Sequence, residues 1–138
     1  MGDDVGRAQA KGSRATGAWD KSLIFDRAHL ARYTMDNTDL EREIMGLFVV
    51  QLPSILASLF AARCTDDWRL ATHTLKGSAQ AIGACRIGEI ARELELLAVF
   101  EKSEKRRKLL ASLLQATREF DDLARSLYPL RATQREAL

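Results

Sequence analysis

One of the two histidines of the chain, His73, lies in the run THTLKGSAQ, three residues before Lys76 and four before Gly77. At about 100° per residue, Lys76 and Gly77 fall on the same helix face as His73, one turn further along. An exposed imidazole is mostly neutral near pH 7, so one ring nitrogen offers a lone pair without help from a general base. This chemistry is that of a nucleophile, and Lys76 would supply a positive charge for phosphoryl oxygens attached to that nitrogen.

The glycine at position 77 is unusual for a helix. Glycine in a helix interior costs about 1 kcal/mol relative to alanine, so this position should need the missing side chain. We interpret Gly77 as an open landing place for a macromolecule that must approach His73 within bonding distance. In the alternative interpretation, His73 and Lys76 are ordinary solvated residues and Gly77 permits close helix packing. His29 has no comparable neighbours, and we expect it to be solvated or to take part in helix capping.

The helix that carries His73 has two distinct faces. Residues within about 60° of His73 are polar or very small: Asp66, Arg69, Lys76, Gly77, Gln80 and Ala84. The opposite face is mainly apolar: Trp68, Ala71, Leu75, Ser78, Ala79 and Ile82. His73 is therefore expected to point outward, with Leu70 as an exposed apolar anchor at the rim and the small residues Ala81 and Ala84 near the site.

Composition places the chain among ordinary helical proteins. Its 138 residues suit one domain, its hydrophobic content is 46%, and its net charge of +2 is too balanced for a nucleic-acid or anionic-membrane surface. There is no uninterrupted apolar run of the ~18 residues that a membrane span needs and no apolar core of a signal peptide, so we expect a cytoplasmic protein.

Other kinds of site lack the residues that they need. Cys64 and Cys85 are not spaced for a redox pair, and we expect both to be buried free thiols. With His29 and His73 they are too scattered for a zinc site. Ser78 is expected on the core side, away from His73, which excludes a catalytic triad.

Capping signals and hydrophobic repeats predict five helices. Asp26 caps the first, the capping-box spacing of Thr38 and Glu41 opens the second, and Gly83 ends the third. The expected ranges are Arg27 to about Tyr33, about 38 to 63, about 65 to 82, Cys85 to about Phe100, and from Ser103 as a cap to about Leu127. The apolar stripe of the second comprises Leu40, Ile44, Leu47, Phe48, Leu52, Ile55 and Leu59, and Pro53 inside this helix suggests a kink or a break.

The expected fold class is therefore all-α. Short connections between long amphipathic helices favour antiparallel neighbours, which gives an up-and-down four-helix bundle with a short additional N-terminal helix. We expect residues 1–21 to be a flexible segment, residues 22–128 to form the bundle, and residues 129–138 to be a polar C-terminal tail.

The run from Ala71 to Ala84, ATHTLKGSAQAIGA, closely resembles the signature of histidine-containing phosphotransfer (HPt) domains. The positions that carry the resemblance are His73, Leu75, Lys76, Gly77, Ser78, Gly83 and Ala84. It continues into TDLEREIMGLFVVQLPSIL before the run and IGEIARELE after it, and covers about residues 22–128.

The resemblance implies roles for particular residues. His73 would be the phosphorylated nucleophile, with Lys76 as the cation beside the phosphoryl group. Glu95, from the following helix, would hold one ring nitrogen of His73 and fix the tautomer so that the other nitrogen attacks. The remaining site residues would admit or contact the partner, and they are Arg69, Leu70, Gly77, Gln80, Ala81, Ala84 and Arg92.

The implied reaction is reversible phosphoryl transfer between His73 and the aspartate of a response-regulator receiver domain, in a phosphorelay that also includes a sensor or hybrid histidine kinase. The receiver would bring Mg²⁺, and no cofactor is expected in this chain. The sequence has no P-loop, kinase-type glycine loop or acidic cluster for Mg²⁺, so we expect a phosphotransfer intermediate without ATP-dependent kinase activity of its own.

Two alternatives stay open. The chain is consistent with a phosphoacceptor domain of a larger hybrid or chemotaxis-type kinase, which an ATP-binding module elsewhere would phosphorylate. It is also consistent with a non-catalytic helical adaptor whose polar face only binds a partner. The sequence names neither the cognate kinase and receiver nor the signal or the oligomeric state.

Overall fold

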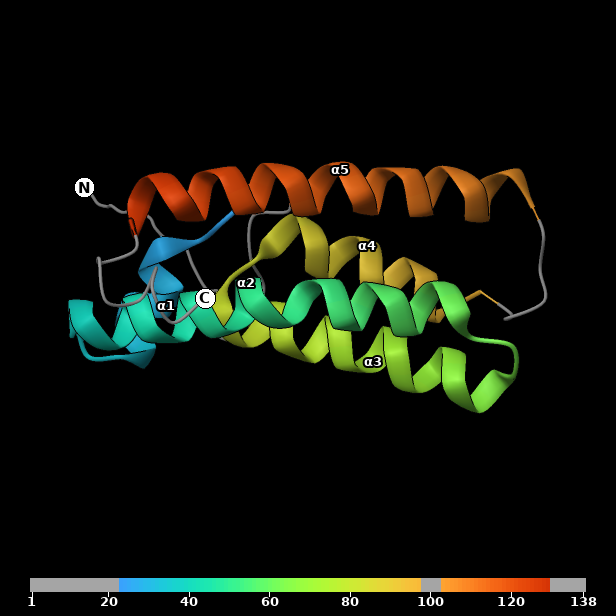
Figure 1. Cartoon of the computed structure of the whole chain (residues 1–138), viewed down its shortest axis with the longest axis horizontal. Coiled ribbons are helices and arrows are strands. Elements are labelled where there is room, and N and C mark those ends of the chain that lie inside the picture. The colour runs from blue at the N-terminus through green and yellow to red at the C-terminus, as the bar shows by residue number, and fades with distance from the viewer. Residues whose placement is uncertain (1–22, 98–102, 130–138) are drawn as a thin grey trace, which may run out of the picture.

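The computed structural model describes residues 23–97 and 103–129, and every described element is a helix. The helices are α1 (Arg27–Tyr33), α2 (Thr38–Ala61), α3 (Thr65–Ile82), α4 (Cys85–Glu95) and α5 (Glu104–Leu127). In Figure 1, α2, α3, α4 and α5 lie along the long axis of a helical bundle, while the short α1 packs at one end against α2 and α3. The predicted all-α class is confirmed for these residues.

Local capping explains where the helices begin. The Asp26 side chain accepts from the backbone N–H of His29 (3.1 Å) and starts α1, and Ser103 does the same for α5 through Arg106 (3.1 Å). The predicted capping box of α2 is wrong, because Asn37 is its N-cap and accepts from the Leu40 N–H (3.0 Å). Glu41 instead points into the protein and is only 3% exposed.

Two helix ends, those of α3 and α4, lie close to the residues discussed below. Gly83 ends α3 with a φ of 90°, as expected, and its N–H donates to the Ala79 carbonyl (2.9 Å). The fourth helix is shorter than predicted, since it ends at Glu95 rather than near Phe100. Glu95 is therefore the last residue of α4.

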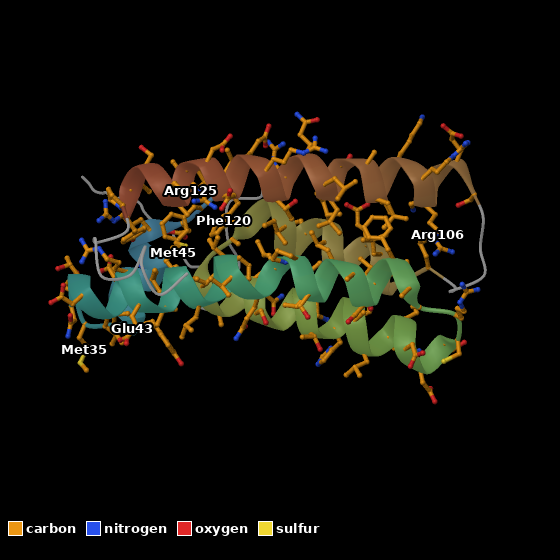
Figure 2. All side chains as sticks on the ribbon, in the orientation of Figure 1. Met35, Glu43, Met45, Arg106, Phe120 and Arg125 are labelled. Atoms are coloured by element: carbon orange, nitrogen blue, oxygen red, sulfur yellow. The ribbon has the colours of Figure 1, made fainter. Side chains whose placement is uncertain are left out.

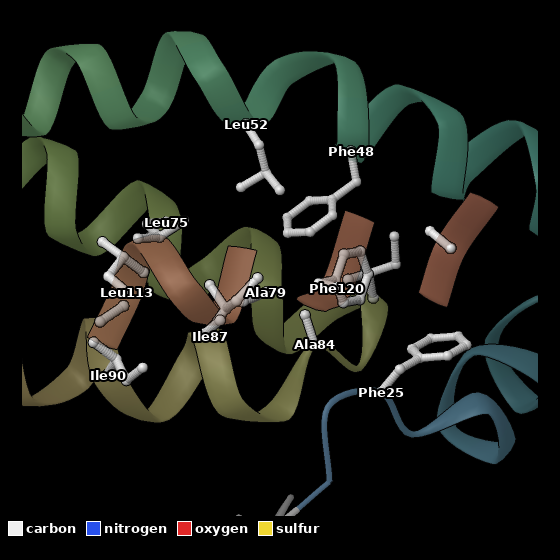
Figure 3. Close-up of a cluster of buried hydrophobic side chains, with 14 of the residues drawn as sticks. Phe25, Phe48, Leu52, Leu75, Ala79, Ala84, Ile87, Ile90, Leu113 and Phe120 are labelled. Carbon is white, nitrogen blue, oxygen red and sulfur yellow. The ribbon is translucent and has the colours of Figure 1, made fainter. Parts of the chain in front are cut away.

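The core lies between the inner faces of the four long helices (Figure 3). Phe120 of α5 makes edge-on contacts with Phe48 of α2 (ring centroids 5.2 Å apart) and with Phe25 before α1 (5.9 Å). Leu75 and Ala79 of α3 are fully buried, as the two-faced pattern of that helix predicted. Burial of one face of α3 holds the opposite, His73-bearing face at the surface.

The predicted inner face of α2 is partly wrong. Leu40 and Leu47 are exposed, whereas Met45 is buried beside Phe48 and Leu52. This helix is apolar on most sides, with a mean hydropathy of 2.0 over an 18-residue window. The hydrophobic periodicity of α2 is therefore compatible with more than one inner face. The helix is continuous through Pro53, so the suggested break does not occur.

By length and composition alone, α2 is long enough and apolar enough to cross a membrane. No other helix in residues 23–97 and 103–129 meets that test. The signal is weak, because core helices of soluble proteins can also meet it. The expectation that no segment could span a membrane rested on uninterrupted apolar runs, and α2 meets the test although polar residues interrupt it.

The two cysteines have different surroundings. Cys85 is buried, as predicted, and its Sγ lies 3.3 Å from the Gly83 carbonyl oxygen. Cys64 is exposed, so its predicted burial is wrong. The reason is its position as the N-cap residue of α3, between two helices rather than on an inner face.

Candidate functional site

His73 stands in the middle of α3 with its ring in solvent. Its side chain is 70% exposed, while its neighbour Thr72 is fully buried and donates its hydroxyl to the Trp68 carbonyl (2.9 Å). The difference in exposure between these two residues follows from the amphipathic pattern of α3, whose inner face packs on α4 and α2. The imidazole is thus carried by a well-anchored helix and remains accessible.

Glu95 is the residue that joins His73 to Lys76. One carboxylate oxygen, Oε2, lies 3.2 Å from His73 Nδ1, and the other, Oε1, accepts from Lys76 Nζ at 2.7 Å. His73 and Lys76 come from α3, whereas Glu95 comes from the end of α4. A single carboxylate therefore bridges an exposed imidazole and an ammonium group across two helices.

The electrostatics of Glu95 set the state of the ring. The hydrogen bond from Lys76 lowers the pKa of Glu95, partial burial opposes this by raising it, and the hydrogen bond with His73 lowers it further. An ionised carboxylate only accepts hydrogen bonds, so the proton between Glu95 and a neutral His73 ring belongs on Nδ1. The opposite nitrogen, Nε2, then has its lone pair free on the exposed side.

Lys76 lies on α3 with His73, as predicted, and has a partner that the sequence did not indicate. Its ammonium group contacts Glu95 and its side chain is only 23% exposed. In this arrangement the ammonium group of Lys76 compensates the negative charge of the Glu95 carboxylate. It also lies one helical turn from His73, which leaves the predicted contact with phosphoryl oxygens as a proposal.

Gly77 is exposed, and a Cβ placed there would meet no atom of the described chain within 4 Å. Close packing between the described helices therefore does not explain this glycine. No contact of the described residues requires a glycine at this position.

The hollow next to His73 is open and has a volume of about 410 Å³. Arg69 and Leu70 line it together with His73 and Glu95. Leu70, 69% exposed, also borders a second hollow of about 440 Å³ between α2 and α3, which Ile55 lines from α2. Sequence reasoning did not find this second hollow, because it depends on the packing of α2 against α3.

The other predicted partner-binding residues are distributed along the same surface, with one exception. Gln80 and Ala81 are exposed on α3, and Arg92 on α4 pairs with Glu89 (3.1 Å). Ala84, however, is fully buried and lies in the core, as Figure 3 shows, so its predicted place on the docking surface is wrong. Gly83, with its positive φ, ends α3 and turns the chain inward, so Ala84 does not continue the exposed helix face.

His29 lies in the first turn of α1 and is partly buried. Its backbone N–H completes the Asp26 cap. The structure shows no carboxylate or ammonium partner for its ring among the described residues. The two histidines of the chain thus have clearly different surroundings.

Comparison with known families agrees with this geometry. The sequence model of the Hpt domain matches residues 43–128, which is more than half of the chain. The chain belongs to the Hpt domain family, whose members carry out histidine phosphotransfer in phosphorelays and work with histidine kinases and response regulators. Neither the curated proteins nor the solved structures gave a significant match.

Proposed function

We propose that His73 is the phosphoacceptor of this domain and that it exchanges a phosphoryl group with the aspartate of a receiver domain. The observation that carries the proposal is the pairing of His73 Nδ1 with Glu95 at 3.2 Å beside an otherwise exposed ring. This pairing leaves Nε2 as the nucleophile. Gly77 keeps the approach open.

In the forward step, Nε2 of His73 forms a bond to phosphorus while the bond from phosphorus to the aspartyl oxygen breaks. The aspartate carboxylate leaves with the electron pair, and the proton on Nδ1 stays where it is. The ring gains positive charge as the new bond forms, and the Glu95 carboxylate stabilises that charge. The reverse step returns the phosphoryl group to a receiver, so the main tasks of the protein are positioning and charge balance.

Lys76 has two tasks in this proposal. In the free domain it compensates the charge of Glu95 through the 2.7 Å contact. When a phosphoryl group is present on His73, its ammonium lies one helical turn away and offers a positive charge to the phosphoryl oxygens. Mg²⁺ would be supplied by the receiver, and this chain would need no ATP-binding machinery.

The docking surface that we propose consists of the exposed parts of α3 and α4 around His73. Leu70 supplies the apolar anchor, and Arg69, Gln80, Ala81 and Arg92 supply the surrounding rim, as their exposure allows. The open hollows on both sides of Leu70 fit a partner that covers α3 and reaches α2.

We further propose that residues 22–128 form the functional unit, an antiparallel up-and-down four-helix bundle with α1 as an additional helix and a cytoplasmic location. The alternating directions of α2 to α5 along the long axis in Figure 1 support this arrangement. Residues 1–21 and all but the first residue of 129–138 lie outside the described residues. Limited proteolysis should leave a stable fragment close to residues 22–128, and cleavage inside α2 to α5 under native conditions would contradict it.

The function is tested by incubating the protein with a panel of receiver domains that carry labelled aspartyl phosphate. Label that moves to this chain and is lost in acid but retained in alkali supports phosphohistidine. Failure to accept label from any receiver or kinase favours the helical adaptor. A phosphoacceptor domain of a larger hybrid or chemotaxis-type kinase would use the same atoms, and the full-length reading frame distinguishes it.

A further inference from the structure

Trp68 connects α3 to the end of α4, directly beneath the proposed site. Its side chain is on the inner face of α3, 1% exposed, and its Nε1–H donates to the carbonyl oxygen of Leu94 at 3.1 Å. Leu94 immediately precedes Glu95, the last residue of α4. The indole therefore holds the backbone one residue before the carboxylate that contacts His73.

Polar contacts hold the end of α4 to α3 both inside the bundle and at its surface. Inside the bundle, the Leu94 carbonyl accepts from Trp68, and at the surface the Glu95 carboxylate contacts His73 and Lys76. The Leu97 N–H also donates to the Leu94 carbonyl (3.1 Å), but this bond joins neighbouring residues and cannot fix α4 relative to α3. Because α4 ends here, no further helical turn holds Glu95 in place.

The indole ring is itself held by the start of α5. The guanidinium carbon of Arg106 lies 4.6 Å from the centre of the Trp68 ring, within cation–π range. Figure 2 shows Arg106 in the first part of α5, on the side of the bundle interior. Trp68 is thus located where α3, the end of α4 and the beginning of α5 meet.

We propose that Trp68 is a positioning residue for the phosphoacceptor: by fixing the Leu94 carbonyl, it sets the Glu95 carboxylate against Nδ1 of His73 and so keeps Nε2 as the free nucleophile. This inference rests on the proposed function of His73. Without the indole N–H, the end of α4 is less constrained and the contact between Glu95 and His73 loosens. The neutral ring then carries its proton on Nε2 more often, and that form is not nucleophilic at Nε2.

The first test is Trp68→Phe, which keeps a buried aromatic ring and removes only the N–H donor. Nitrogen NMR of the two labelled histidines at about pH 8, where imidazoles are neutral, reports the tautomer of each ring. We expect the Nδ1–H fraction of His73 to fall, and that of His29, as an internal reference, to stay the same. The rate of transfer from a phosphorylated receiver should fall on the order of tenfold.

Tyr128→Phe is the matched control. It also removes one polar donor from a buried aromatic side chain, the hydroxyl that donates to Glu41 (3.0 Å). Tyr128 directly follows α5, and Figure 1 places that end of α5 at the opposite end of the bundle from the end of α4. This variant should leave the His73 tautomer and the transfer rate unchanged.

An unchanged His73 tautomer in folded Trp68→Phe would overturn the inference, and so would an equal change in Tyr128→Phe. If Trp68→Phe does not fold, Arg106→Gln loosens the same ring from outside the core. A smaller change of the His73 tautomer in the same direction then supports the inference, and no change overturns it. The tautomer is measured without phosphate, so a protein that shows the expected tautomers but accepts no phosphoryl group would contradict the proposed function alone.

Discussion

Two carboxylates lie at helix ends in this protein, and their surroundings are opposite. Glu41, in the first turn of α2, is 3% exposed and accepts from the hydroxyls of Tyr128 (3.0 Å) and Thr34 (3.4 Å). Glu95, at the end of α4, is at the surface and contacts Lys76 and an exposed histidine. Glu41 joins α2 to residues that follow α1 and α5, whereas Glu95 leaves the second ring nitrogen of its partner open to solvent.

The comparison shows how a structural carboxylate differs from one that can serve chemistry. The partners of Glu41 are enclosed with it, and Arg27 Nε approaches to 3.8 Å from the outside. A buried carboxyl group needs hydrogen-bond partners, because burial of an unpaired polar group is costly. The partner of Glu95 keeps its second ring nitrogen exposed, so in the proposed function the same type of hydrogen bond would orient the nucleophile.

Two glycines of the α3 region repeat the contrast. Gly83 has a φ of 90°, and a Cβ there would lie 2.7 Å from the Asp26 carbonyl oxygen. The two residues are this close because the Asp26 N–H donates to the Gly83 carbonyl (2.8 Å). Gly77 has free space around it. The fold needs the first glycine, whereas no contact among the described residues requires the second, which we propose keeps the approach of a partner open.

Gly83→Ala should cause the largest loss of stability. The new Cβ meets backbone rather than a movable side chain, and alanine disfavours this φ, so we expect a loss of about 3 kcal/mol. Chemical denaturation measures it. Gly46→Ala, a helical glycine whose Cβ would also find open space, is the control and should be neutral or slightly stabilising. Equal stability of the two variants would contradict the structural role of Gly83.

Glu41→Ala should destabilise the protein by about 2 kcal/mol, because it leaves the Tyr128 hydroxyl without its acceptor and opens a gap. Receiver-dependent transfer by the folded variant should stay normal. Glu41→Gln keeps an acceptor of nearly the same size and should lose less stability. A strong loss of transfer without a loss of stability would remove the distinction between the two carboxylates.

Gly77→Gln should leave the fold intact and raise stability by up to about 1 kcal/mol, since glutamine is the better helix former. Transfer from a phosphorylated receiver should nevertheless be impaired, because the side chain occupies the approach to His73. Thermal melting and the transfer rate, measured on the same preparation, check both parts. Normal transfer would disprove our explanation of this glycine.

The pH dependence of Glu95 should be the smallest effect. Its pKa is lowered in the folded state, chiefly by Lys76, so its contribution to stability is fully present above the unfolded-state pKa of about 4.3 and is lost as pH falls through the folded value. The stability difference between the wild type and Glu95→Gln should therefore shrink as the pH falls from neutral to below the unfolded-state pKa. Urea denaturation across this range measures it, and a constant difference would contradict the assignment.

Local patterns predicted those parts of the fold that local interactions determine. The start of α1, the end of α3 and the start of α5 follow from Asp26, Gly83 and Ser103, whose capping hydrogen bonds join residues only three or four positions apart. The inner face of α2 was ambiguous, because leucine, isoleucine and valine residues of α2 occur on most sides of this helix. The packing of the other helices selects Met45 rather than Leu47 for the core.

The site shows the same division. The outward direction of His73 and its helix neighbours could be predicted from the 3.6-residue period of α3. The burial of Ala84 could not, since it depends on how the chain turns after Gly83. Nor could the bond between Trp68 and Leu94, which joins residues on different helices. The burial of Glu41 depends on Tyr128, from the far end of the described chain.

The most direct test of the central claim is transfer from a labelled receiver to three proteins: the wild type, His73→Gln and His29→Gln. Both variants should keep the helicity and melting temperature of the wild type nearly unchanged, because neither side chain is in the core. We predict that the wild type and His29→Gln acquire acid-labile phosphate and that His73→Gln acquires none. Undiminished labelling of folded His73→Gln would contradict the account.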